Sequence, residues 1–260
     1  MAIARRALER IEQFPLGRRT GRKDPWSGDD ILFLVSATLH SAFTSGIRLV
    51  AELAVTAGLV LVAFAFYLLV WTNQQTAAAQ RGLLDDFHDQ SKGVAKAEKP
   101  GELQQPDAGE GFGVLHIPRL GEDWEWVVVE GVTDDALSQG PGHFPGTALP
   151  GQVGNFAVAG HRATHGEPFA DLDRLEVGDQ VVVESVGEWL TYEVTWERIV
   201  SPSATEVVEP VAGYPGATPE QRTLTLVTCH PRWGSSERLV VGAQLVERRT
   251  AASGPPAAIA

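Results

Sequence analysis

The sequence predicts an all-β domain, either a barrel or a sandwich, that follows a single transmembrane helix. Two observations lead to this prediction. From residue 111 onward the chain consists of short alternating apolar runs separated by Gly and Pro turns, with room for only one or two short helices. Before these runs, residues 53–71 form 19 consecutive uncharged residues, enough to cross a hydrocarbon core of about 30 Å.

The charges on either side of the apolar run predict its orientation. Residues 1–48 carry eight Lys and Arg, whereas the 20 residues after Trp71 carry only Arg81. The positive-inside rule therefore predicts a cytoplasmic tail at residues 1–48, a retained signal anchor at residues 49–71, and an extracytoplasmic remainder.

A second, weaker apolar stretch at residues 31–47 complicates this topology. It contains His40 and five Ser or Thr, which favours a helix at the membrane surface, or a packed helix, over a second span. The second span stays open as an alternative, and it would reverse the predicted orientation.

Residues 72–110 are poor in large apolar side chains, and we expect them to form an extracytoplasmic spacer. The part of the chain beyond residue 71 carries 13 Lys and Arg against 27 Asp and Glu, a formal net charge of −14. Such a domain repels nucleic acid and anionic lipid headgroups, so neither is an expected partner. A single cysteine excludes an internal disulfide, and no cofactor is expected.

Residues 111–249 carry the predicted β domain. Seven runs have strand character, at 112–120, 124–132, 155–162, 180–185, 189–200, 222–229 and 237–246. Short helices are plausible at 133–138 and 168–175. We expect the tail at residues 250–260 to be disordered.

The cysteine lies at the end of the run at 222–229. Period-two alternation places Leu224 and Leu226 on one face of this strand and Cys229 on the other, as a reactive thiol requires. Arg238 opens the next run. If the two runs pair as a hairpin, the Arg238 guanidinium lies beside the thiol, where it can donate several hydrogen bonds to a substrate carbonyl.

His161 is the candidate proton carrier, because it ends the run at 155–162. Ala157 and Ala159 share its face and leave room for a ligand beside the imidazole. The alternative is a metal site made of His161, His165 and His143. The spacing of His161 and His165 aligns two ligands only on a helix, whereas His161 follows a strand, so we expect no metal.

The combination of these segments resembles the sortase family of Gram-positive transpeptidases. The sequence has AGHR at 159–162, TLVTC at 225–229 and an Arg nine residues after the Cys. Between and before them stand LHIPRLG, QGPGHFPGTALPGQVGN and FADLDRLEVGD, so the resemblance covers most of residues 111–246. The PGTALPGQVGN and TCHP stretches are most similar to class E, the housekeeping sortases of many actinobacteria.

This resemblance implies a closed β-barrel of about eight strands and specific roles for several residues. Cys229 would be the nucleophile, His161 the acid and base, and Arg238 the oxyanion and substrate clamp. Thr228 would line the oxyanion region, and Phe144, His230 and Trp233 would line the substrate site. Phe144 departs from the family pattern, in which a Tyr often stands at this position, and this leaves the motif preference open.

The implied activity is cleavage of an LAxTG or LPxTG sorting motif between Thr and Gly. The acyl group would then pass to an amine of a cell-wall precursor of the lipid II type, which anchors surface proteins to the wall. The enzyme would be a single-pass membrane protein with its catalytic domain outside. Two alternatives remain: a non-catalytic, membrane-tethered binding module, and a Cys–His peptidase that hydrolyses its substrate. A papain-like enzyme is disfavoured, because it places Cys before His.

Overall fold

The computed structural model describes residues 28–94 and 104–259. It divides into two compact units, one up to Leu61 and the other from Val62 onward. The first 27 residues of the predicted cytoplasmic tail and residues 95–103 of the predicted spacer lie outside the described residues.

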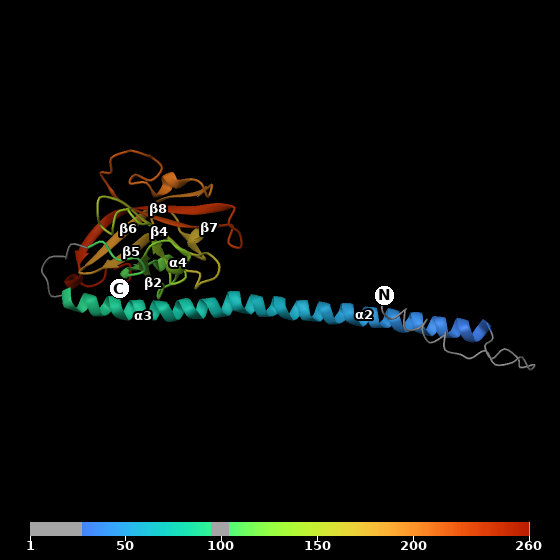
Figure 1. The fold of residues 1–260 in the computed structure, drawn as a ribbon. Helices are drawn as coiled ribbons and strands as arrows, with labels where there is room; N and C mark the ends of the chain where they lie inside the picture. Colours follow the sequence, from blue (N-terminus) through green and yellow to red (C-terminus); the bar gives the residue numbers. More distant parts are fainter. Residues whose placement is uncertain (1–27, 95–103, 260) are drawn as a thin grey trace, which may run out of the picture. The chain divides into compact units, whose positions relative to one another are not determined.

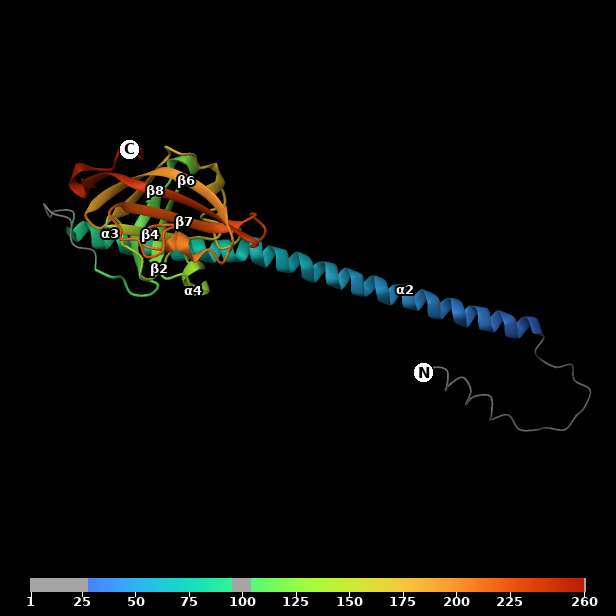
Figure 2. The same cartoon turned by 90° about the horizontal axis from the view of Figure 1, so that it is seen from above.

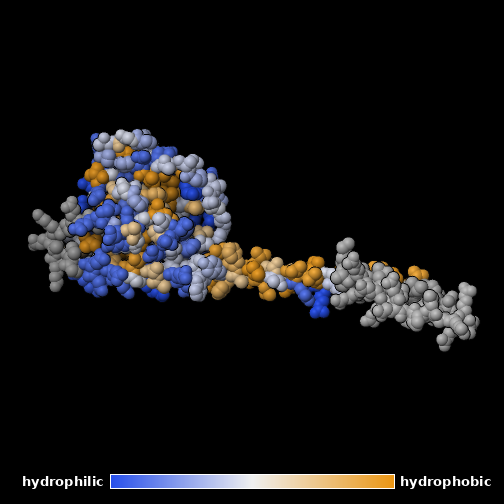
Figure 3. All heavy atoms as spheres, viewed as in Figure 1, coloured by the Kyte–Doolittle hydropathy of each residue, from blue (hydrophilic) through white to orange (hydrophobic). Residues whose placement is uncertain are grey.

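The first described element is helix α2, Gly28–Phe66. Its large apolar side chains are exposed, among them Leu39, Val50 and Leu61, and Figure 3 shows them as an apolar surface on the helix. It belongs to the one helix, among the described residues, that is long and apolar enough to cross a membrane. Residues 31–47 lie in the first part of α2, which continues without a break to Phe66. Their position relative to a membrane stays a prediction.

The backbone stays helical from α2 into the second unit. A π-helical turn, Tyr67–Trp71, is flanked by Phe66 and Thr72, which both have helical backbone angles. Helix α3, Thr72–Val94, follows. The first part of the predicted spacer is therefore a helix that packs against the barrel, and Phe87 is buried in a small cluster with Val114 and Val127.

Eight strands close into a barrel in the order β1-β2-β3-β4-β7-β8-β6-β5. This confirms the predicted fold class. Figures 1 and 2 show α3 along the outside of the barrel, next to β2. The strands are β1 (Gly111–His116), β2 (Glu125–Glu130), β3 (Gly142–His143), β4 (Gly154–Ala159), β5 (Gln180–Ser185), β6 (Glu188–Val200), β7 (Arg222–His230) and β8 (Glu237–Thr250).

The barrel is filled by the inward-facing residues of every long strand. Phe156, Val158, Leu224 and Leu226 belong to one continuous core cluster in which most side chains are almost fully buried. Strand β3 was not predicted, because two residues are too short for an alternating pattern to be recognised. The two predicted short helices correspond to the single turn α4 (Asp134–Leu137) and the 3₁₀ turn Leu172–Arg174. Further 3₁₀ turns lie at Pro118–Leu120 and Thr205–Val208.

The predicted disordered tail requires a correction. Strand β8 continues to Thr250, because it pairs with the long strand β6 as far as Glu188. A 3₁₀ turn at Ala251–Ser253 follows, and its first residue donates a backbone hydrogen bond to the carbonyl of Gly187. Composition alone does not show such backbone pairing, since it depends on the partner strand.

Candidate active site

Strand β7 is the centre of the candidate site, because it lies between parallel β4 and antiparallel β8. Cys229, near the end of β7, is half-buried and is directly paired with Arg238 at the start of β8. Side chains of directly opposed residues have Cβ atoms about 5 Å apart, so both project to the same side of the sheet. The predicted hairpin is therefore present, and it places a guanidinium-bearing residue next to the thiol.

The alternation of β7 also agrees with the prediction. Leu224 and Leu226 are buried in the barrel core. Residues 223, 225, 227 and 229 consequently face the outside of the barrel, where Cys229 shares a surface with Thr225 and Val227.

His161 reaches the same place through the parallel pairing of β4 with β7. Ala159 is opposite Val227, and the backbone N–H of Gly160 donates to the carbonyl of Val227 at 3.0 Å. His161 and Cys229 each lie two residues beyond this matched pair. Both residues therefore follow closely after the last paired positions of two neighbouring strands, whose backbones are about 4.8 Å apart where they pair.

Thr228 strengthens this alignment. Its side chain is buried, and its hydroxyl donates a hydrogen bond of 2.8 Å to the carbonyl of Gly160. The hydroxyl is thus committed to the backbone next to His161. If Thr228 contacts the oxyanion, it does so through its backbone, because its side chain joins the ends of β4 and β7.

Gly160 is required by a close approach. A Cβ atom at this position would lie 2.5 Å from the Phe169 ring, which is fully buried in the core. The backbone N–H of Phe169 donates to the carbonyl of His161 at 3.0 Å and closes the loop that follows β4. The glycine therefore allows the loop to fold back directly beneath the histidine.

The His161 imidazole has a distinctive electrostatic environment. It is partly buried and stacks on His165, with ring centroids 4.8 Å apart and an interplanar angle of 25°. Burial is the larger cause that lowers the pKa of His161 below its ordinary value, and the neighbouring His165 lowers this pKa further, whereas Asp134 acts in the opposite direction. The lowered pKa favours the uncharged form of the imidazole, which can accept a proton.

The Arg238 guanidinium folds back on the β7–β8 turn. Its Nη1 donates to the carbonyls of Ser235 and Glu237, at 3.0 and 2.9 Å. Within the described residues its Nε and Nη2 groups have no hydrogen-bond acceptor. They leave three N–H donors for a substrate carbonyl or oxyanion near Cys229.

Arg162 is a site residue that sequence reasoning missed. It is buried next to His161, and its Nη1 contacts Nδ1 of His230 at 2.9 Å. Its Nη2 forms an ion pair of 2.6 Å with Asp173. Arg162 thereby ties the residue after His161 to the residue after Cys229. The only indication of Arg162 in the sequence was its place in the AGHR segment. Whether an Arg is buried or exposed cannot be decided before the fold is known.

His230 and Trp233 were predicted to line the substrate site. In the structure the His230 ring contacts Arg162, and His230 therefore supports the backbone next to Cys229. Trp233 lies in the β7–β8 turn, is 70% exposed, and has the Arg232 guanidinium over its ring. Arg232 also forms a 2.7 Å ion pair with Glu167, which joins the β7–β8 turn to the loop after β4.

The outer face of β4 and β7 is covered by the β6–β7 loop, residues 201–221. Asn155, fully buried on β4, holds this loop: its Nδ2 donates to the carbonyls of Val207 and Glu209. Its Oδ1 accepts a 2.7 Å hydrogen bond from the Thr225 hydroxyl. Asn155 stands in the quoted PGTALPGQVGN stretch, but its role is visible only once the loop is placed over it.

A pocket of about 410 Å³ lies between this loop and the strands. Thr223 and Thr225, on the outward face of β7, form part of its floor, and Val211 and Tyr214 of the loop line it. The pocket therefore shares with Cys229 the outer face of β7.

Phe144 lies beside this outer face. Its backbone N–H donates to the carbonyl of Ala157, and its neighbour His143 is buried inside the barrel. Successive residues of an extended chain point to opposite sides, so the half-buried Phe144 side chain is directed outward, next to Ala157. This position suits the predicted contact with substrate.

The three histidines of the alternative metal site do not converge. His143 is fully buried in the barrel, where its Nδ1 contacts Glu130 at 2.5 Å, whereas His161 and His165 stack on the outside. No group of three or more His, Cys, Asp or Glu among the described residues is arranged to hold a metal ion.

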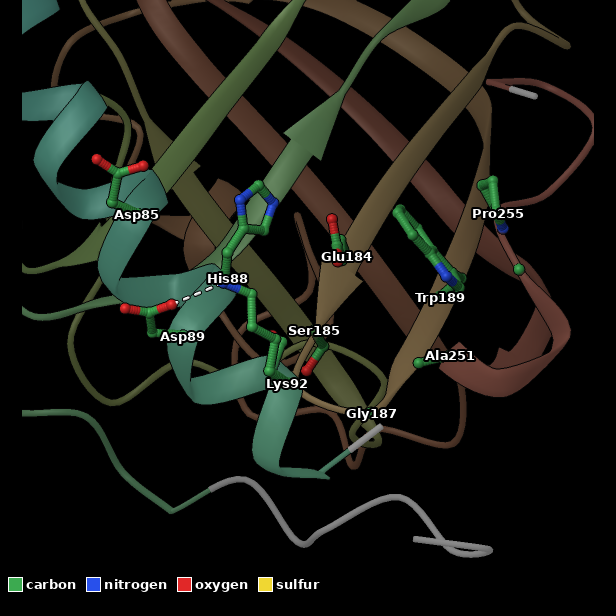
Figure 4. A pocket seen from close by; sticks show the side chains of 12 residues that line it. Asp85, His88, Asp89, Lys92, Glu184, Ser185, Gly187, Trp189, Ala251 and Pro255 are labelled. Atoms are coloured by element: carbon green, nitrogen blue, oxygen red, sulfur yellow. Dashed lines mark hydrogen bonds and ion pairs between the residues drawn. The ribbon is translucent and has the colours of Figure 1, made fainter. Parts of the chain in front are cut away.

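A second cavity, of about 630 Å³, lies elsewhere. Figure 4 shows it between α3, which contributes His88 and Lys92, and the β5–β6 hairpin, with Ser185 and Trp189. This hairpin pairs with the end of β8 opposite to Arg238. The cavity is therefore not part of the site around Cys229.

A closed β-barrel that carries one thiol, one imidazole and one guanidinium near the ends of neighbouring strands has the groups that acyl transfer through a cysteine requires. Comparison with known proteins identifies the family. The sortase domain model matches residues 115–246. The chain therefore belongs to the sortase family, whose members are cysteine transpeptidases, and its relatives place it in class E.

Three relatives illustrate the similarity. The sortase SrtE1 of Streptomyces coelicolor is 35% identical over 82% of this chain, which spans 60% of the length of that protein. The structure of sortase E from Streptomyces avermitilis is 42% identical and covers 60% of this chain and all of its own, with a TM-score of 0.55. The crystal structure of sortase E1 from Streptomyces coelicolor with a tripeptide in the active site is 38% identical, with the same coverage and a TM-score of 0.54.

Proposed function

We propose that this chain is a membrane-anchored transpeptidase that cleaves an LAxTG- or LPxTG-type sorting motif between Thr and Gly and transfers the acyl group to an amine of a cell-wall precursor. The observation that supports the proposal is the direct pairing of Cys229 on β7 with Arg238 on β8, together with the parallel pairing of β7 with β4, the strand that precedes His161. The expected partners are surface proteins with sorting signals and a lipid II-type acceptor.

The dimensions of the outer face support an extended peptide substrate. Thr225, in the floor of the pocket under the β6–β7 loop, precedes Cys229 by four residues, about 13 Å along a strand. In an extended peptide, three residues before the scissile carbonyl span roughly 10 Å. If the peptide runs along β7, the backbone of the first residue of a four-residue motif ending in Thr comes to within about 3 Å of Thr225, a gap that the side chain of that residue can span. A tripeptide occupies the active site of the sortase E1 relative, which favours the same use of this surface.

The chemistry follows from the three side chains. The uncharged His161 imidazole takes the thiol proton as the Cys229 sulfur attacks the Thr carbonyl, and Arg238 donates hydrogen bonds to the oxyanion. The tetrahedral intermediate collapses to a thioester when His161 returns this proton to the Gly amine, which leaves. In the second half the acceptor amine attacks the thioester, His161 removes its proton, and the thiol is regenerated.

The proposed location is the cell membrane. The exposed apolar helix serves as the anchor, and the excess of Lys and Arg before it places the N-terminus in the cytoplasm and the barrel outside. Protease added to intact, wall-stripped cells should then remove the barrel. Protection of the barrel would refute this orientation.

The activity is tested by incubating the full chain, in detergent or nanodiscs, with an LAxTG or LPxTG peptide and an amine acceptor. We expect a transpeptidation product that disappears in Cys229→Ala, and a thioester adduct at Cys229 detectable by mass spectrometry. Release of free acid with no amide product would instead identify a hydrolase. Absence of both cleavage and thioester with every sorting peptide would leave a binding module and refute the proposal.

A further inference from the structure

The first turn of helix α3 contacts the loop that follows His161. The side-chain Oδ1 of Asn73 accepts a 2.9 Å hydrogen bond from the backbone N–H of Gly166. One residue earlier, the Thr72 hydroxyl accepts a longer hydrogen bond, 3.4 Å, from the backbone N–H of His165. Two consecutive residues of the loop are therefore bound to two consecutive residues of the helix.

Side-chain packing reinforces this contact. A Cβ atom on Gly166 would lie 2.5 Å from the Trp126 ring and 3.0 Å from Cγ2 of Thr76, so the loop backbone sits directly on α3 and β2. Thr76 is itself buried, and its hydroxyl donates to the carbonyl of Ser138. The loop therefore rests on a part of α3 that is anchored to the barrel.

The loop requires such support because its backbone is unfavourable by itself. Thr164, His165 and Glu167 all have positive φ angles of 51–75°, and Gly166 between them has φ of 75°. Non-glycine residues in this region cost about 1–3 kcal/mol each and persist only where the surroundings hold them. The hydrogen bonds that Thr72 and Asn73 accept stabilise the two middle residues of this strained run, His165 and Gly166.

The same loop shapes the surroundings of the imidazole. His165, one residue before the Asn73 contact, stacks on His161, and its Nδ1 is within 3.0 Å of the Thr164 hydroxyl. Release of Gly166 would free His165 to leave the stack, which would change both the position and the solvation of His161.

We propose that Asn73 is a positioning residue for His161. It joins the helix that continues from the membrane anchor to the loop 161–168, and it thereby holds the imidazole beside Cys229. The helix that leaves the membrane is in this way part of the active-site framework in addition to its role as a tether. This inference rests on the proposed function for its activity readout, and its structural readout is independent of that function.

The test compares Asn73→Leu with Gln75→Leu in the full chain. Both substitutions replace a polar helical residue by Leu, but Gln75 is exposed. Asn73→Asp is the conservative variant, because a carboxylate retains the acceptor oxygen for the Gly166 N–H. Rates are normalised to the amount of thiol that reacts with an irreversible Cys229 probe, so that loss of folded protein does not count as loss of turnover.

We expect Asn73→Leu to lower kcat between about 10- and 100-fold with little change in KM for the sorting peptide, because a displacement of about 1 Å in a catalytic group has an effect of this size. Gln75→Leu and Asn73→Asp should remain within about twofold of wild type by the same reasoning. Equal kcat values for Asn73→Leu and Gln75→Leu would overturn the proposal. If Asn73→Leu does not fold, the same comparison is decided by Asn73→Ala against Gln75→Ala.

A second readout is the titration of His161, followed by NMR of the imidazole in the Cys229→Ala background. Loosening the loop exposes the His161 ring and moves His165 away from it. The pKa of His161 should therefore rise in Asn73→Leu and stay unchanged in Gln75→Leu. The other charged group that acts on this pKa, Asp134 on α4, is the same in Asn73→Leu and Gln75→Leu. An unchanged pKa in Asn73→Leu would count against the proposal. If the wild-type chain is inactive on every sorting peptide, the proposed function is refuted. The proposed role of Asn73 is then still tested by this titration, which does not depend on activity.

Discussion

Replacement of Arg238 by Lys separates the catalytic use of the guanidinium from any contribution to folding. Lys retains the positive charge and most of the side-chain length, but it presents a point charge in place of the planar fork of donors. In the structure the guanidinium uses Nη1 on the carbonyls of Ser235 and Glu237, which belong to its own turn. The groups that remain for substrate, Nε and Nη2, are those that Lys cannot reproduce.

The two expected effects of this substitution differ greatly in size. The contacts of Arg238 are exposed and local, so the free energy of unfolding should change by no more than about 0.5 kcal/mol. Removal of a donor to a developing oxyanion costs about 2.7–4 kcal/mol of transition-state stabilisation, a factor of about 10² to 10³ in kcat. Turnover should therefore fall strongly at nearly constant stability.

The assay is single-turnover formation of the Cys229 thioester with a sorting peptide, next to chemical denaturation of the same preparations. Arg249→Lys is the matched control, because Arg249 lies on the same strand and its Nη1 also donates to a backbone carbonyl, that of Pro255. A thioester rate for Arg238→Lys within about threefold of this control, less than 1 kcal/mol, would refute the assigned role of the guanidinium.

Two further predictions concern residues around the site, Asn155 beneath the β6–β7 loop and the neighbours of His161. Asn155→Ala removes three hydrogen bonds shorter than 3.3 Å and should destabilise the barrel by about 2–4 kcal/mol. It should also raise KM for the sorting peptide, because the β6–β7 loop is released; an unchanged KM would exclude that loop from peptide binding. His165→Ala should raise the pKa of His161 and move the acid limb of kcat/KM to higher pH, because burial and the second imidazole both lower this pKa. Asp134→Asn should shift the limb in the opposite direction, and equal shifts of one sign in both variants would contradict this electrostatic account.

The strand pattern, the face of β7 that carries Cys229, and the hairpin with Arg238 were all predictable from the sequence. Each depends on local periodicity or on a short connection, and the eight residues between Cys229 and Arg238 leave a hairpin as the simplest arrangement. The apolar run before Trp71 was equally readable, because its length alone matches the requirement for a membrane span.

That His161 acts together with Cys229 was predicted from the sequence only through a family resemblance. Strands β4 and β7 are parallel neighbours although more than 60 residues separate them, and local patterns contain no information about such pairings. Two other segments were misjudged for different reasons. Strand β3 is too short to show alternation. The end of the chain was judged from composition, which does not reveal that β8 pairs with β6 as far as Thr250 or that Ala251 binds the carbonyl of Gly187.

The sequence by itself therefore determined most of the strands, the pairing of Cys229 with Arg238, and the long apolar helix, since all of these depend on residues close together in the chain. Only the tertiary structure decided which groups hold the site in place. Arg162 binds His230, Asn155 holds the β6–β7 loop, and Asn73 holds the loop after His161. Each of these polar side chains acts on a backbone or side-chain partner more than 50 residues away, and such a partner is defined only when the barrel closes.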